Sequence, residues 1–215
     1  MIGSTSPSVQ PETIFYQHGE SPAQRTTFGY LATDHPRLDA VQNGISAVCA
    51  VISSTAIAVI AVLTTVEVVS RMAFDSPLGW NVGLVEQYLM MSIAFFGTVT
   101  AYRSGAHVAV ATIFERVPVL ARKILLILTY LLILGSLVLL VYSSTQAAHF
   151  AFVTGQAPPP GMADLPWPTW SWKSIIPVAA ILGAIVVAID LYRELTSSVD
   201  RVSTDYETNG TTEGS

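Results

Sequence analysis

Four long apolar stretches set the hydrophobic pattern of this chain, and polar segments separate them. They cover about residues 45–69, 82–102, 122–145 and 174–192. As a helix, the first stretch would be ~37 Å long, which exceeds the ~30 Å hydrocarbon core of a bilayer. The pattern therefore predicts an all-α integral membrane protein, folded as a four-helix unit.

A different pattern lies between the second and third stretches. Apolar residues such as Val110, Ile113 and Phe114 recur there at helical spacing, with charged residues between them. Pro118 should interrupt a helix at this point, because proline lacks the backbone N–H. We therefore expect a short amphipathic helix over roughly residues 109–116 in the membrane surface, with Pro118 near the first turn of the third span.

The two ends of the chain differ from this pattern in composition. Residues 1–42 and 197–215 are rich in Ser, Thr, Gly and charged residues, and neither segment contains a long apolar run. Such segments cannot bury enough apolar surface to offset the entropy of ordering. We expect two disordered tails around one membrane domain at residues 43–196.

Composition agrees with a membrane protein. The chain is 51% hydrophobic and 12% charged, against about a quarter charged for soluble domains. Its formal net charge of −5 comes largely from acids near the two ends, and no basic patch indicates nucleic-acid binding. Cys49, the single cysteine, excludes an intrachain disulfide, and we expect it simply to pack.

The second span has the features of an assembly helix. Its small residues Gly97, Ala101 and Gly105 would form one stripe, and such stripes allow close packing against other helices. Glu86 lies about one turn into the helix, where the helix dipole favours a carboxylate. A structural acid is the first interpretation of Glu86, and an acid that couples transport to protons or sodium is the alternative.

The end of the first span carries a possible ion pair. Glu67 and Arg71 are four residues apart, so they can face each other on one side of a helix. We interpret them as a local pair that anchors the helix end at the interface, in preference to part of an ion pathway.

The segment before the fourth span is rich in proline and tryptophan. Its prolines prevent a long helix, while Trp167, Trp170 and Trp172 favour the membrane interface. We expect a stiff loop that faces water and covers this end of the helix bundle.

The basic residues predict the topology. With four spans, eight Lys and Arg residues lie in the two tails and the second loop, and two lie in the other loops. Positive charge favours the cytoplasmic side. Both termini are therefore predicted to be cytoplasmic, with the Trp-rich loop outside.

The chain shows no catalytic pattern, cofactor motif or metal-ligand spacing. His107 and His149 are predicted at opposite ends of the spans, so they cannot share one haem iron across the bilayer. An enzyme is not indicated. Two further interpretations stay open: a stand-alone four-helix carrier or channel, and an anchor subunit of a redox complex. The centres of the four spans have almost no polar residues, which fits a subunit of a larger membrane complex better.

The order of these features resembles the small membrane subunit, of the DctQ type, of tripartite ATP-independent periplasmic (TRAP) transporters. The resemblance covers about residues 43–195, and its most specific element is the exit of the second span, Arg103-Ser-Gly105-Ala-His107-Val108. The other matching positions are Arg71, Trp80, Glu86, Gly97, Val117-Pro118, Arg122, Trp172, Ile176 and Pro177.

This resemblance implies a role without direct contact to a substrate. A large multi-span permease subunit would carry out sodium-coupled uptake, and a periplasmic binding protein would deliver a small organic acid. The present chain would brace the static scaffold in the bacterial inner membrane, and Trp167, Trp170 and Trp172 would help to dock the binding protein. From the residues and the resemblance together, we expect assembly or structural roles for Glu67, Arg71, Glu86, Gly97, Ala101, Arg103, Gly105 and His107.

Overall fold

The computed structural model describes residues 24–26, 29–31, 36–76, 78–103, 118–157 and 167–196. Within these residues the structure is almost entirely helical, and four helical segments are long and apolar enough to cross a membrane. They run over Pro36–Phe74, Asn81–Arg103, Lys123–Val153 and Thr169–Thr196. The predicted all-α, four-span fold is confirmed.

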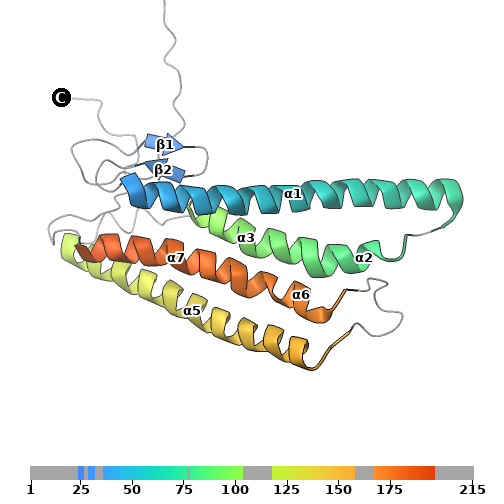
Figure 1. The fold of residues 1–215 in the computed structure, drawn as a ribbon. Helices are drawn as coiled ribbons and strands as arrows, with labels where there is room; N and C mark the ends of the chain where they lie inside the picture. Colours follow the sequence, from blue (N-terminus) through green and yellow to red (C-terminus); the bar gives the residue numbers. More distant parts are fainter. Residues whose placement is uncertain are drawn as a thin grey trace, which may run out of the picture.

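The elements follow one another as a hairpin and a series of antiparallel helices (Figure 1). Their bounds are β1 Gln24–Thr26, β2 Gly29–Leu31, α1 Pro36–Phe74, α2 Asn81–Leu84, the π-helix η1 Val85–Leu89, α3 Met90–Arg103, α5 Val119–Val153, α6 Thr169–Lys173 and α7 Ile175–Thr196. Elements α2, η1 and α3 form one continuous span.

Regular structure begins earlier in the chain than the hydrophobic pattern indicates. Strands β1 and β2 pair antiparallel within the segment predicted to be a disordered tail, and β2 packs against α1. Helix α1 starts at Pro36, nine residues before the predicted span. Proline suits a first helical turn, because that turn does not need its N–H, and the following polar residues are helical because they pack against other helices.

The spanning helices lie in a row in the order α1, α3, α7, α5 (Figure 1). Helix α1 packs on α3, α3 on α7 and α7 on α5, whereas α1 meets α7 over a short stretch. We call the end with the first turn of α1 the Asp39 end, and the opposite end the Trp167 end. Both α3 and α7 finish at the Asp39 end, where α1 and α5 begin.

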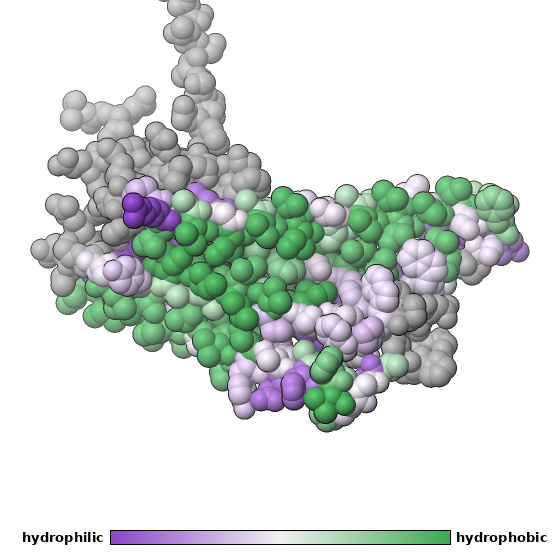
Figure 2. All heavy atoms as spheres, in the orientation of Figure 1, coloured by the Kyte–Doolittle hydropathy of each residue, from purple (hydrophilic) through white to green (hydrophobic). Residues whose placement is uncertain are grey.

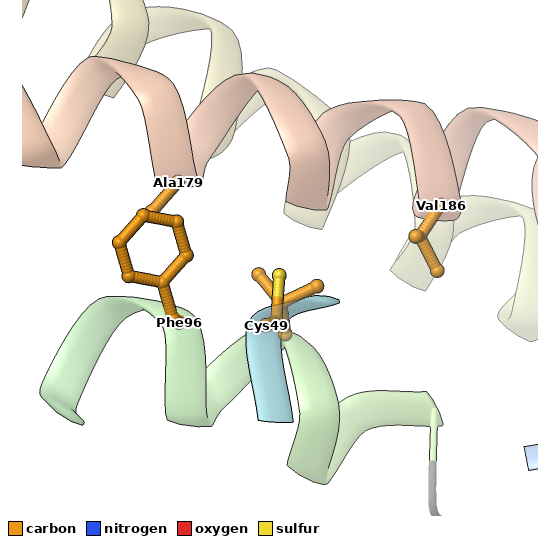
Figure 3. Close-up of a cluster of buried hydrophobic side chains, with 5 residues drawn as sticks. Cys49, Phe96, Ala179 and Val186 are labelled. Atoms are coloured by element: carbon orange, nitrogen blue, oxygen red, sulfur yellow. The ribbon is translucent and has the colours of Figure 1, made fainter. Parts of the chain in front are cut away.

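The apolar core lies where α1, α3 and α7 converge. Cys49, Phe96, Val99, Ala179 and Val186 form this core, and Figure 3 shows side chains from the three helices pointing toward one another. The predicted packing role of Cys49 is thus confirmed. Since lipid tails are as apolar as these side chains, close van der Waals packing holds such a core together more than removal from water does.

Backbone geometry explains two helix ends at the Trp167 end. After α5, Gly155 has φ +60°, and the N–H groups of Gly155 and Gln156 donate to the carbonyls of Phe152 and Ala151. This is the Schellman pattern, which satisfies the last carbonyls of the helix. After α1, Asp75 has φ +50°, a left-handed conformation that aspartate tolerates better than most residues.

Candidate functional site

A buried ion triad ties together three helices at the Asp39 end. Oδ1 of Asp39 on α1 lies 2.7 Å from Nη2 of Arg103 on α3 and 2.8 Å from Nη2 of Arg193 on α7. The three side chains are at most 3% exposed. One carboxylate therefore holds two guanidinium groups from two other helices.

A second carboxylate extends this triad into a network. Asp190 on α7 accepts a hydrogen bond from Nε2 of Gln42 at 2.7 Å and another from the Tyr102 hydroxyl at 3.0 Å. Gln42 Nε2 also donates to the carbonyl of Val186 at 2.9 Å. Together with Asn43, which accepts from Arg103 Nε at 3.2 Å, these residues form what we call the polar cluster. Its members are Asp39, Gln42, Asn43, Tyr102, Arg103, Asp190 and Arg193.

Among the side chains that the structure describes at this end, acids and bases are buried together. The acids are Asp39, Asp190 and Glu194, and the bases are Arg103, Lys123 and Arg193. A buried ion costs several kcal/mol or so unless it is paired and hydrogen-bonded. The pairing of Asp39 with Arg103 and Arg193 lets these charges lie between helices, and it makes their contacts specific to one helix arrangement.

The local position of each charge also suits its helix. Asp39 is in the first turn of α1, while Arg103 and Arg193 are in the last turns of α3 and α7. The helix dipole favours acids at N-termini and bases at C-termini. Antiparallel helices bring these termini to the same end of the row, so each charge stabilises its own helix and also the contact between helices.

The predicted pair at the Trp167 end is present. Arg71 Nη2 lies 2.9 Å from Glu67 Oε1, and Arg71 itself is largely exposed. Glu67 Oε2 also accepts the N–H of Leu78 at 3.0 Å and Nδ2 of Asn81 at 3.2 Å. Glu67 therefore connects the end of α1 to the turn and to the start of the second span.

The residues predicted on the second span occupy different environments. Glu86 is exposed at the start of η1 and makes no hydrogen bond or ion pair with the described residues. A Cβ added at Gly97 would meet nothing within 4 Å, and Ala101 is half-buried. Gly105, His107 and the predicted amphipathic helix over 109–116 lie outside the described residues.

The predicted Trp-rich loop is described from Trp167 onward. Tyr88 meets Trp167 edge to face, with ring centroids 5.2 Å apart, and its hydroxyl lies 2.5 Å from Ser171 Oγ. Trp170 contacts Phe152 in the same way, and Lys173 Nζ lies 5.6 Å from the centroid of the Trp172 ring. These contacts join α6 to the second span and to α5.

The sequence interpretation missed most of the polar cluster. It placed Asp39 and Gln42 in the tail at residues 1–42. A signal was present, because Asp39, Gln42 and Ser46 continue the spacing of three and four residues that leads into the buried side of α1. These three residues are polar, so a pattern of apolar residues does not include them.

The described residues contain no group of three His, Cys, Asp or Glu side chains arranged to hold a metal ion. The fold and the cluster define a multi-pass membrane protein with a structural polar network. The family model described as "Tripartite ATP-independent periplasmic transporters, DctQ component" matches residues 60–197, well over half of the chain. The chain belongs to this family and is a small membrane subunit of a TRAP-type transporter. A comparison with curated proteins found no match.

The family match includes Arg103, Asp190 and Arg193, whereas Asp39 and Gln42 lie before it. Four of the seven residues of the polar cluster therefore lie in the family region, and the other three lie before it, near the start of α1.

Proposed function

We propose that this chain is the scaffold subunit of a secondary transporter that takes up small organic acids by symport. A larger multi-span permease subunit moves the substrate, and a periplasmic binding protein delivers it. The complex lies in the bacterial inner membrane. Family membership supports this role, and the distribution of charge along the spans carries the argument for a scaffold.

That distribution is the decisive observation. The central sections of the four spans contain no Asp, Glu, Lys, Arg or His; these sections are residues 45–66, 87–102, 124–148 and 174–189. Transporters and channels place ionisable groups at mid-depth to bind or relay ions. The chain alone provides no such path, so its contribution is to support a subunit that does.

The proposed orientation places both termini in the cytoplasm. Within the described helices, basic residues at the Asp39 end are Arg37, Arg103, Arg122, Lys123 and Arg193, and those at the Trp167 end are Arg71 and Lys173. The positive-inside preference favours the Asp39 end as cytoplasmic. The polar cluster then lies on the inner side, and the tryptophans lie on the periplasmic side.

The periplasmic side offers a docking surface for the binding protein. Trp167, just before α6, and Trp170, in α6, are 49% and 39% exposed, and they pack against Tyr88 and Phe152, respectively. Rigid, partly exposed aromatic side chains are frequent contacts in protein interfaces. We propose that Trp167, Trp170 and Trp172 contribute to this docking.

Co-purification tests the scaffold role. The tagged full-length chain is expressed in its native membrane, solubilised in mild detergent and captured, and the bound proteins are identified by mass spectrometry. We expect a larger multi-span protein in stoichiometric amount. Capture of the folded chain without any such protein would contradict the proposal.

A further inference from the structure

Two buried polar atoms lie at the inner edge of the polar cluster, on the side of α1 that packs within the chain. Gln42 and Ser46 are about one helical turn apart on this face, and both side chains are 0% exposed. Oε1 of Gln42 and Oγ of Ser46 have no hydrogen-bond partner among the residues that the structure describes. A buried polar atom that loses its bonds to water is unfavourable unless another partner replaces them. The two atoms therefore indicate a bound group that supplies the missing hydrogen bonds.

The orientation of the Gln42 amide is fixed by its neighbours on α7. Nε2 donates to the carbonyl of Val186 at 2.9 Å and to Oδ1 of Asp190 at 2.7 Å. Both partners are acceptors, so exchanging the amide oxygen and nitrogen would place oxygen against oxygen. Oε1 must therefore be the other branch of the amide, and it requires a donor from elsewhere.

The hydroxyl of Ser46 differs from those of two other buried serines in the described spans. Ser53 and Ser144 each donate to the carbonyl four residues earlier in the same helix. This is the usual partner of a serine inside a helix. The equivalent carbonyl for Ser46 is that of Gln42, but the Ser46 hydroxyl makes no such bond among the described residues. The hydroxyl is therefore available to a partner other than its own helix backbone.

Helix geometry brings the two atoms toward the same space. Side chains in a helix lean toward its N-terminus, so the Ser46 hydroxyl leans toward the Gln42 side chain. Thr100 on α3 donates to the Ser46 carbonyl at 3.2 Å, so α3 covers this section of α1. Gln42 and Ser46 lie about 5 and 10 Å along the helix from Asp39. Figure 2 shows hydrophilic surface at the start of α1, beside the hydrophobic surface of the spans, so the path from external water is short.

We propose that one buried water molecule binds between Gln42 and Ser46. The water donates a hydrogen bond to Oε1 of Gln42 and accepts one from the Ser46 hydroxyl. It suits this pair because it is small and is both a donor and an acceptor, and buried waters commonly satisfy polar groups in this way. With this water the Gln42 amide has a partner for its oxygen as well as its nitrogen. The hydrogen-bonded network then extends from the polar cluster to the edge of the apolar core.

A sodium ion would also bind to oxygen atoms, but the charges at this end favour a neutral ligand. Arg103 and Arg193 are buried in the same cluster. The two carboxylates of the cluster already accept contacts, Asp39 from guanidinium groups and Asp190 from an amide and a phenol. A further cation would be close to two positive charges, and their repulsion is strong away from water.

A structure of the full-length chain, at a resolution that shows ordered waters, tests the site directly. We expect density for one water within about 2.5–3.2 Å of both Gln42 Oε1 and Ser46 Oγ. The proposal would be overturned by well-ordered side chains without this density. It would also be overturned by a direct bond between the two side chains, or by a Ser46 hydroxyl bonded to the Gln42 carbonyl.

Thermal unfolding of matched variants in detergent tests the hydrogen bonds of the water. Ser46→Ala removes one of its two partners. Ser53→Ala is the matched control, because Ser53 is buried on the same face and bonds to its own helix backbone. We expect Ser46→Ala to lower the melting temperature by about 2–4 °C and Ser53→Ala to change it by less than about 1 °C. Equal shifts would count against the water.

A larger apolar side chain distinguishes a bound water from a dry gap. Ser46→Val displaces the water and leaves Gln42 Oε1 without a donor, so we expect a lower melting temperature than for Ser46→Ala. A melting temperature at or above that of Ser46→Ala would mean that the added methyl groups fill a dry gap, and the proposal would be wrong.

The salt present during unfolding distinguishes water from a cation. We expect the wild-type chain to melt at the same temperature in sodium, potassium and choline chloride of equal concentration. A ligand that binds the folded chain raises its melting temperature. A higher melting temperature in sodium chloride alone would therefore identify a sodium site in place of the water. None of these measurements requires the permease subunit, so their outcome is independent of the scaffold role.

Discussion

Asp39 and Arg103 are 64 residues apart in the chain, and 2.7 Å separates Oδ1 of the first from Nη2 of the second. Arg193 approaches the same oxygen from a third helix. In a bilayer, apolar contacts between helices gain little from the hydrophobic effect, so directional contacts have more weight in choosing one arrangement. The polar cluster therefore determines how α1, α3 and α7 meet, and its residues are the first to test.

Replacing Asp39 by Asn removes the charge that two buried guanidinium groups share. We expect Asp39→Asn to lower the free energy of unfolding by about 3 kcal/mol or more, because it leaves uncompensated buried charge. Thermal unfolding in detergent measures the effect. Asp75→Asn is the matched control, since Asp75 is exposed and asparagine also tolerates positive φ. Equal stability of the two variants would mean that the triad does not hold the helices together.

The Tyr102 hydroxyl donates to Asp190 across the interface between α3 and α7. Tyr102→Phe removes this bond and keeps the ring, so we expect a loss of about 1.5 kcal/mol, typical for a hydrogen bond to a charged group. Tyr192→Phe is the control, because that side chain is 57% exposed. A chemical-denaturant series on both variants would reveal the difference, and identical midpoints would argue against a structural role for the Tyr102 hydroxyl.

Gly183 on α7 is buried and faces side chains of both α3 and α5. A Cβ built there lies 3.4 Å from Cγ2 of Val99 and 3.7 Å from Cδ1 of Leu137. Alanine therefore fits, whereas we expect Gly183→Leu to destabilise the row by about 1–3 kcal/mol through overpacking. Gly135→Leu, which enters open space, should have little effect. Thermal unfolding compares the two variants, and similar loss in both would show that the helix spacing at Gly183 is adjustable.

Glu67 and Arg71 form a pair, but their contributions should differ. Arg71 is 67% exposed and contacts Glu67, whereas Glu67 also holds the Leu78 N–H and the Asn81 amide. Exposed ion pairs contribute little to stability. We therefore expect Glu67→Ala to lower the melting temperature more than Arg71→Ala does. Both melting temperatures are measured in the same detergent. A larger decrease for Arg71→Ala than for Glu67→Ala would mean that Arg71 contributes more to stability than Glu67 does.

Much of the fold could be predicted from the chain alone. Apolar runs longer than the hydrocarbon core require helices in a membrane, because every backbone N–H and C=O must find a partner within its own segment. This reasoning identified the four spans. It also placed Arg103 at the end of the second span, where the polar cluster now includes it.

The N-terminal start of α1 could not be predicted in this way. A search for apolar runs starts the first span at Ile45, but the helix continues back to Pro36 because Asp39 and Gln42 find partners on α3 and α7. A polar residue at a helix end has the same appearance in the sequence whether it meets water or a buried arginine. Its partner is more than sixty residues away, so no local pattern distinguishes the two cases.

The order of the helices was likewise decided in three dimensions. Each span has an apolar surface on most sides, and hydropathy shows that it can cross a membrane without showing which neighbour it contacts. The sequence by itself therefore determined how many helices cross the membrane, roughly where they lie, and the family to which their motifs point. Only the tertiary structure decided that they form a row with α1 at an edge. Many packings of these helices are equally apolar. Contacts between buried charges from distant parts of the chain, and close approach at small residues, select one of them.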